Sequence, residues 1–173
     1  LLAFLFMGSI SFGQSLKFEM TIKKTGTIVE DGDTINVSSD DAEQENNDID
    51  ALYDDDLDAG WEGEPDDQNV LTTGMRFQSI AIPKGANIDS AFIIVHSHEG
   101  KTVDDVAKIT IVGNDVDDAV TFNESDLITD RKETSASILW TVAEKWEIYQ
   151  PYTTPDLKSI VQEIVDRNGW EAG

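Results

Sequence analysis

The chain has 173 residues, no cysteine and a formal net charge of −23 at pH 7. So negative a charge argues against nucleic acid and anionic membrane surfaces as partners, because their phosphates would repel it, and it favours cations. Without cysteine there are no disulfides, so a domain of this length must be stabilised by core packing, by bound metal or by both.

The first thirteen residues are apolar and uncharged, and they end in the small residues Ser11 and Gly13. This pattern predicts the hydrophobic region and cleavage site of a secretory signal peptide, with Gln14 as the first mature residue. The run is too short to span a bilayer. Because no Met and no basic segment precede Leu1, we expect residues 1–13 to be a signal-peptide remnant and the protein to be exported to the extracellular space or the cell surface.

The remaining chain divides into a lead-in segment, residues 14–36, and one module, residues 37–173. The lead-in region contains weak strand patterns at Leu16–Ile22 and, running into the module, at Thr34–Ser38. There is no internal repeat and no linker rich in Pro or Ser in the sequence, which favours a single domain.

An acidic segment runs from Glu30 to Asp67, with seventeen Asp or Glu residues and no Lys or Arg. One interpretation is a solvated acidic loop or a strongly acidic surface. The other is that some of these carboxylates converge on Ca²⁺, which takes about six to eight oxygen ligands and needs no cysteine. Export favours the second interpretation, because extracellular calcium is abundant enough for weak sites.

The candidate calcium residues are Asp40, Asp41 and Glu43, with Asp117 and Asp118 from a later acidic loop. The later loop is needed because carboxylates adjacent in sequence rarely all reach one ion. The alternative for the first three residues is a solvated turn.

A second acidic run has the alternating spacing of a calcium loop, at Asp54, Asp56 and Asp58. An EF-hand is not expected, because Ala59 and Pro65 stand where that motif has Gly and Glu, and no helices flank the run. A looser calcium loop and a solvated segment both stay open.

Strand patterns dominate the chain after the acidic segment, at Leu71–Ile82, Ile88–His98, Ala107–Gly113 and Ser135–Val142. The first pattern changes phase near Gln78–Ser79, which predicts a β-bulge. Pro83–Ala86 predicts a turn, because Pro presets φ and Gly permits a positive φ. The second pattern is apolar on both faces, which is typical of a central strand.

One helix is expected near the end of the chain, with Thr154 as its N-cap and Pro155 at its first position. Asn168–Gly169 is a stop signal. Apolar residues recur at helical spacing and form one stripe, which should cover a sheet edge or close one end of a sandwich: Leu157, Ile160, Val161, Ile164 and Val165.

Several segments together resemble a β-sandwich module of large secreted and surface proteins of bacteria. The acidic opening is Val37–Glu43, and the paired-strand signature is Gly74–Phe77 with Ile82–Ala86. The later parts follow in the same order, at Ala91–Phe92, Asp118–Phe122, Thr134–Trp140, Thr154–Leu157, Ile164–Val165 and Gly169–Trp170.

The resemblance implies an all-β, antiparallel, jelly-roll-like sandwich with one C-terminal helix, similar to the carbohydrate-binding-like modules attached to adhesins and hydrolases. In such modules a final strand follows the Gly–Trp turn, so we expect this chain to be a fragment that lacks it and leaves a sheet edge unpaired. The chain departs from the pattern in its long acidic insert and at His96 and His98, where an acidic pair is usual.

His96 and His98 lie two apart on a predicted strand and so share a face. They fit a transition-metal site, but they also share the face of Phe92 and Ile94, which favours a cap on the core at the rim of the sheet.

Aromatic side chains offer a second kind of candidate site. Trp146, Tyr149 and Tyr152 fall in a predicted loop before the helix, where they are candidates for a glycan-binding rim. Trp140 lies on an apolar strand face and is expected in the core.

No sequence motif specifies a catalytic chemistry, since there is no Cys nucleophile, no G-x-S-x-G and no H-E-x-x-H. The sequence therefore predicts a non-catalytic extracellular module that is stabilised by calcium and contacts glycans or neighbouring domains. The alternative is an ancillary domain of a secreted hydrolase whose catalytic domain lies downstream.

Overall fold

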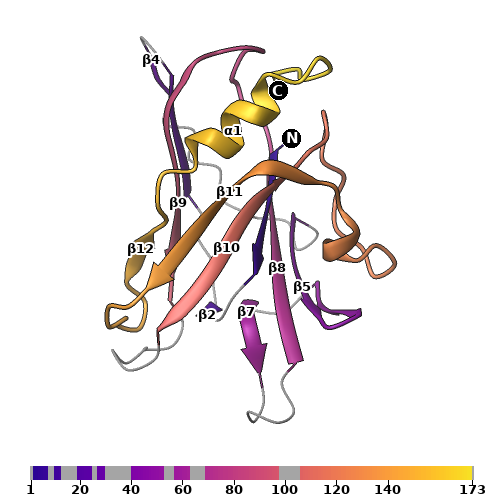
Figure 1. Cartoon of the computed structure of the whole chain (residues 1–173), viewed down its shortest axis with the longest axis vertical. Helices are drawn as coiled ribbons and strands as arrows, with labels where there is room; N and C mark the ends of the chain where they lie inside the picture. Colours follow the sequence, from indigo (N-terminus) through magenta and orange to yellow (C-terminus); the bar gives the residue numbers. More distant parts are fainter. Residues whose placement is uncertain are drawn as a thin grey trace.

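The computed structural model describes residues 2–7, 10–12, 19–24, 27–29, 40–52, 57–62, 69–97 and 106–172. Within these ranges the chain forms antiparallel sheets and one short α-helix, which confirms the predicted all-β class (Figure 1). None of the helices in the described part of the chain is long and apolar enough to span a membrane.

The larger sheet has eight antiparallel strands. They are β1 (Leu2–Met7), β2 (Ile10–Phe12), β5 (Asp41–Glu45), β6 (Asp48–Ala51), β7 (Leu57–Glu62), β8 (Asn69–Phe77), β10 (Ala107–Asn114) and β11 (Glu133–Val142). The main path runs β11, β10, β1, β8, β5 and β6, while β7 pairs with the start of β8 and with β2.

The smaller sheet has four strands, in the order β12, β9, β3 and β4. Their bounds are Pro151–Thr153 for β12, Ile88–His96 for β9, Glu19–Lys24 for β3 and Thr27–Val29 for β4. β9 lies between two partners, as its two apolar faces predicted. β3 confirms part of the weak strand pattern at Leu16–Ile22, whereas Thr34–Ser38 lies outside the described residues.

One hydrophobic core draws on both sheets and on the helix α1 (Lys158–Val165). Its buried side chains come from β8, β9, β10, β11 and α1, and they include Met75, Ile93, Ile109, Val142 and Ile160. A smaller, second core lies on the opposite face of the larger sheet. The adjacent residues Ile111 and Val112 of β10 point to opposite faces, and they belong to the main core and the second core respectively. Phe122 and Ile128 complete this second core.

The apolar stripe of the predicted helix is fully buried, and α1 contacts β9, β10 and β11. The close approach depends on Gly113, since a Cβ there would stand 2.7 Å from Ile160 Cγ2 and 2.7 Å from Ile164 Cδ1. The helix thus packs across the end of both sheets because β10 has no side chain at this position.

The predicted start of the helix is wrong by about one turn. Thr154 is no N-cap, because its Oγ1 accepts a hydrogen bond from Ile93 N at 3.0 Å and ties the segment to β9. The helix instead begins at Lys158, whose backbone N–H donates to Asp156 Oδ1 at 3.0 Å. Asp156 also accepts from Ala91 N, so it joins the helix start to the sheet.

The turn at Pro83–Ala86 is confirmed, with Ala86 N donating to Pro83 O at 3.0 Å and Gly85 at a φ of 69°. The predicted bulge near Gln78–Ser79 is not a bulge, because β8 ends at Phe77 and Ser79 turns the chain with a φ of 55°. Ile80 and Ile82 are buried beyond the strand end.

The described parts of the acidic segment contain strands. Asp41 and Glu43, expected in or beside a loop, lie inside β5, and Asp58 lies inside β7. Ala42 packs in the second core, so alternation turns Asp41 and Glu43 towards the face that carries the main core.

The predicted signal-peptide segment forms β1, a strand between β8 and β10. Leu2 pairs with Phe77 and Met7 with Thr72 on one side, and Phe4 pairs with Gly113 on the other. An apolar run of six residues therefore takes a central place in the larger sheet.

Replacing Gly113 with Ala should destabilise the fold by about 1–3 kcal/mol, because the added methyl group forces α1 away from β10. Thermal unfolding would measure this loss. The control is Gly85→Asn, because an added Cβ at this position meets no atom within 4 Å and Asn tolerates a positive φ, so this change should cost less. Equal stability of Gly113→Ala and the wild type would contradict the close packing.

Candidate functional site

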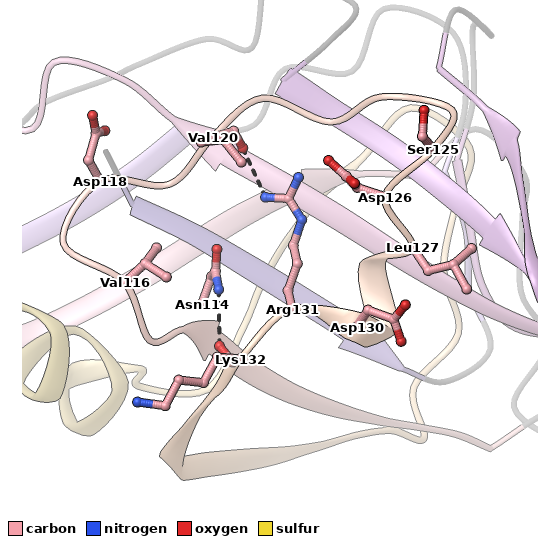
Figure 2. Close-up of a pocket in the computed structure, with 10 residues that line it drawn as sticks. All are labelled: Asn114, Val116, Asp118, Val120, Ser125, Asp126, Leu127, Asp130, Arg131 and Lys132. Carbon is pink, nitrogen blue, oxygen red and sulfur yellow. Dashed lines mark hydrogen bonds between the residues drawn. The ribbon is translucent and has the colours of Figure 1, made fainter.

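A pocket of about 300 Å³ opens on the outer face of the larger sheet, beside the segment that connects β10 to β11. We call it the loop pocket (Figure 2). Seven of its ten lining residues have polar or charged side chains, and the lining residues are Asn114, Val116, Asp118, Val120, Ser125, Asp126, Leu127, Asp130, Arg131 and Lys132. Arg131 lies in the middle of the view, with Asp118 on one side and Asp126 and Asp130 on the other.

Arg131 holds one wall of the loop pocket in place. Its two terminal nitrogens donate to Val120 O and Thr121 O, each at 2.9 Å, and its guanidinium lies 4.2 Å from the ring centre of Phe122. Its Nε is buried and has no hydrogen-bond partner among the described residues. Burial lowers the pKa of this guanidinium, and the nearby charge of Asp126 opposes that shift.

A second arginine fixes the same loop from the sheet beneath. Arg76 on β8 donates through Nε to Ala119 O at 2.7 Å and forms an ion pair with the buried carboxylate of Asp40. Beside it, Gly74 leaves room for Phe122, since a Cβ there would stand 2.4 Å from the ring. Three successive carbonyls, from Ala119 to Thr121, are thus held by two arginines.

The far end of the loop is anchored to β5. Gln44 is buried and donates to Thr129 Oγ1 at 2.9 Å, while Thr129 N donates to Gln44 Oε1 at 3.0 Å. Thr129 belongs to the 3-10 helix η2 (Ile128–Asp130), and Ile128 fills the second core. The loop pocket is therefore preformed, with its walls tied to three strands.

Two carboxylates at the start of the loop form ion pairs with basic side chains. Asp115 forms ion pairs with Lys132 and Arg167, and the hydrogen bond from Lys132 is the main reason that its pKa lies below the usual range. Asp117 accepts from Arg167 Nε at 2.7 Å, which helps to raise the pKa of Arg167. This network links the loop to the turn that follows α1.

The five predicted calcium residues do not come together in the structure. Asp40 is paired with Arg76 and Gln78, and Asp117 with Arg167, so both carboxylates already have strong donors. Glu43 accepts from Asp58 N, and Asp118 lines the loop pocket. Across the described ranges, no group of three or more His, Cys, Asp or Glu side chains is arranged to hold a metal ion.

The carboxyl group of Asp41 is strongly affected by its burial. It is paired with the buried Met75, and burial, followed by the neighbouring charge of Asp40, raises its pKa to about 7. Ionisation of this group in the folded protein is unfavourable near neutral pH, because burial and the neighbouring Asp40 carboxylate both oppose the negative charge.

The three residues of the predicted aromatic rim differ in exposure, since one is buried and another is exposed. Trp146 is only 1% exposed and stacks on Tyr152, with ring centres 4.1 Å apart, so it belongs to the core rather than to a rim. Tyr152 lies in β12, and its hydroxyl accepts from Glu147 N at 2.6 Å. Tyr149 is 60% exposed, and it adopts a φ of 61°. Trp140 is buried in the core, as predicted.

The structure describes only some of the remaining candidate residues from the sequence. His96 is half-buried on β9 and pairs with Pro151. His98, Asp54, Asp56 and Pro65 lie outside the described residues.

Asp118 is the one predicted site residue that lines the loop pocket; the other residues that build it were missed by sequence reasoning. Nothing in the sequence marked Arg131 or Arg76 as a functional residue, and Gly74 was noted only as part of the strand signature Gly74–Phe77. One signal was present, because a glycine inside a strand pattern often marks the close approach of another group. The partner, Phe122, lies 48 residues away, and no local pattern identifies it.

The chain matches no protein-family model, no curated protein and no solved structure. The resemblance to a bacterial β-sandwich module therefore stays a prediction, and the geometry of the loop pocket is the basis for a functional proposal.

The pH dependence of stability should report on Asp41. Because its folded pKa is raised above the unfolded value of 3.8, the free energy of unfolding should fall as pH rises from about 4 to about 7 and then level off. Asp41→Asn should remove this component and raise stability at pH 8 by on the order of 2–4 kcal/mol. Denaturant unfolding across this pH range, with the exposed Asp50→Asn as the control, measures both effects. Identical pH profiles for Asp41→Asn and the wild type would refute the assignment.

Calcium should add little through the five predicted residues. We expect the melting temperature to rise with NaCl, because screening weakens the repulsion of a −23 charge, and to be the same in millimolar Ca²⁺ and in EDTA at matched ionic strength. A calcium-specific rise of several degrees, reversed by EDTA, would contradict this, since saturating a site stabilises by about 2.7 kcal/mol at a hundredfold excess over Kd.

Proposed function

We propose that this chain is a non-catalytic extracellular β-sandwich module of a larger secreted or cell-surface bacterial protein, and that it binds a neutral glycan in the loop pocket. The apolar, signal-like first thirteen residues support export. The two antiparallel sheets, which share one core closed by α1, support a sandwich of the jelly-roll type.

The observation that carries the proposal is a preformed pocket in which charged and polar side chains lie beside apolar surface. Sugar hydroxyls both donate and accept hydrogen bonds, and the pocket offers both kinds of partner. Asp118, Asp126 and Asp130 supply carboxylate acceptors, while Arg131 and Lys132 carry further N–H groups besides those bound to Val120 O, Thr121 O and Asp115. A fixed set of such groups lowers the entropy lost on binding, because the protein side is already ordered.

The charge of the molecule selects among glycans. A net charge of −23 disfavours polyanionic ligands such as sulfated or uronate-rich polysaccharides, because long-range repulsion opposes their approach. Arg131 next to the carboxylates also makes the pocket a poor site for a simple divalent cation, since its positive charge repels the ion. A neutral, polyhydroxylated ligand meets neither penalty.

Affinity electrophoresis of the exported protein through gels that contain soluble neutral polysaccharides tests this proposal. We expect retardation by at least one of β-glucan, xylan or galactomannan. Asp130→Ala removes one exposed pocket carboxylate and should weaken binding about tenfold, which corresponds to about 1.4 kcal/mol. The matched control, Asp50→Ala, removes an exposed carboxylate on β6 and should bind like the wild type.

Absence of retardation by every neutral polysaccharide would exclude the glycan proposal. Equal retardation of the wild type and Asp130→Ala would show that the glycan binds outside the loop pocket. In that case the exposed Tyr149, at the opposite end of β11, is the next residue to replace.

A further inference from the structure

The turn that follows α1 contains an Asn–Gly pair, Asn168–Gly169, and no other Asn in the sequence precedes a Gly (Figure 1). Trp170 N donates to Arg167 O at 3.3 Å, so the pair forms the middle of the turn. Both residues are exposed. In the described part of the chain, neither the side-chain amide of Asn168 nor the N–H of Gly169 has a hydrogen-bond partner. The two groups are therefore free to react with each other.

An exposed Asn followed by Gly readily closes to a cyclic imide, because Gly has no Cβ to hinder attack by its own backbone nitrogen. The deprotonated nitrogen of Gly169 attacks Cγ of Asn168, a new N–Cγ bond forms, and the side-chain nitrogen takes a proton from water and leaves as ammonia. Water then opens the ring. Breaking the new N–Cγ bond gives aspartate, whereas breaking the original peptide bond gives isoaspartate, and water is the only co-reactant.

Lys84 places a positive charge on the peptide unit that reacts. Its Nζ donates to Asn168 O at 2.6 Å, and this oxygen belongs to the same peptide unit as the nitrogen of Gly169. When that nitrogen loses its proton, amide resonance shares the negative charge with the oxygen. An ammonium group held against the oxygen stabilises this charge as it develops, as preorganised donors do in an active site. The contact favours the nucleophilic form of the nitrogen.

Two hydrogen bonds fix the turn that carries Lys84 to the turn after α1. Gly85 N donates to Val165 O at 3.1 Å, and Trp170 Nε1 donates to Ile82 O at 2.9 Å. These bonds lie on either side of the lysine and on either side of the reacting pair. The folded chain therefore keeps the ammonium group beside this peptide unit, although the two turns are far apart in the sequence.

Asn87 provides a contrast within the same molecule, since it is exposed like Asn168. The next residue is Ile88, whose branched side chain hinders attack, and its N–H donates to Gln162 Oε1 at 2.8 Å. The side-chain amide of Asn87 donates to Asp89 Oδ1 at 3.1 Å. Both groups that would have to react are occupied, so we expect this asparagine to stay intact.

We propose that Asn168–Gly169 is a site of spontaneous modification, at which the folded protein slowly converts Asn168 to aspartate and isoaspartate while Lys84 promotes ring closure. This inference depends neither on export nor on glycan binding. The modification also reaches the network at the start of the loop pocket, because the adjacent Arg167 pairs with Asp115 and Asp117.

The isoaspartate product should loosen this turn. It lengthens the backbone by a methylene group next to Gly169, which packs so closely on Asp117 that a Cβ on the glycine would clash with the carboxylate. The turn must then move, and the buried Trp170 is the side chain that moves with it.

Incubation of the full chain in mildly alkaline buffer, folded and in denaturant, tests the proposal. Mass spectrometry of peptides that contain Asn168 measures the exchange of NH₂ for OH, and labelling by an isoaspartyl methyltransferase measures isoaspartate. In the folded protein we expect modification of Asn168 and none of Asn87. Lys84→Gln should slow the folded reaction at least about threefold, because the positive charge is lost. Lys84→Arg keeps the charge and should restore most of the rate.

The matched control is Lys158→Gln, which removes an exposed lysine at the other end of α1 and should react like the wild type. In denaturant the wild type and both glutamine variants should react at one rate, because the contact from Lys84 exists only in the folded protein. An Asn168 that stays intact in the folded protein while the denatured chain is converted would overturn the proposal. Equal folded rates for the wild type and Lys84→Gln would also overturn it.

Thermal unfolding of aged protein tests the structural consequence. Material rich in isoaspartate should melt below Asn168→Asp, which carries the charge of one product without the extra methylene group. Equal melting temperatures would overturn the inference that the turn loosens.

Discussion

The pairing of β1 with both β8 and β10 is the interaction on which the rest of the structure depends. β10 carries α1 and β11 on one side, while β8 carries β5, β6 and β7 on the other, and β1 is the strand that joins these two halves. The loop pocket is built across the same junction, because its loop starts at β10 and rests on Gly74 and Arg76 of β8. The loop is held across this junction by its own contacts with β8 and β5, and these contacts shape the pocket.

Arginine is scarce in this acidic chain, and the fold uses it for structure around the loop. The guanidinium of Arg76 joins a buried carboxylate to a backbone carbonyl, that of Arg131 holds two further carbonyls over an aromatic ring, and that of Arg167 joins two carboxylates to the turn after the helix. The planar guanidinium suits this task, because it donates in several fixed directions and stays charged when partly buried. Asp40 and Asp117, two of the carboxylates that the sequence offers to a cation, are thus paired with arginines within the protein.

The elements that the sequence predicted best are those with a strong local period. The alternation in β11 places Trp140 and Val142 in the core, and the helical stripe of α1 is buried throughout. The acidic strands β5 and β7 were missed because their residues are rare in strands, and only pairing with β8 makes them extended. Trp146 was assigned to an exposed rim because its loop is polar in sequence, whereas the fold turns the ring inward against Tyr152.

The sequence by itself determined the all-β class, the late helix, the turn at Pro83–Ala86 and the excess of negative charge, because each depends on periodicity or composition within a short window. Only the tertiary structure decided which carboxylates are neutralised and where a pocket forms. Arg131 and Phe122, for example, become a pocket wall only when Gly74 lies beneath them. Such contacts join residues far apart in the chain, and their energies depend on burial and on partners that no local pattern records.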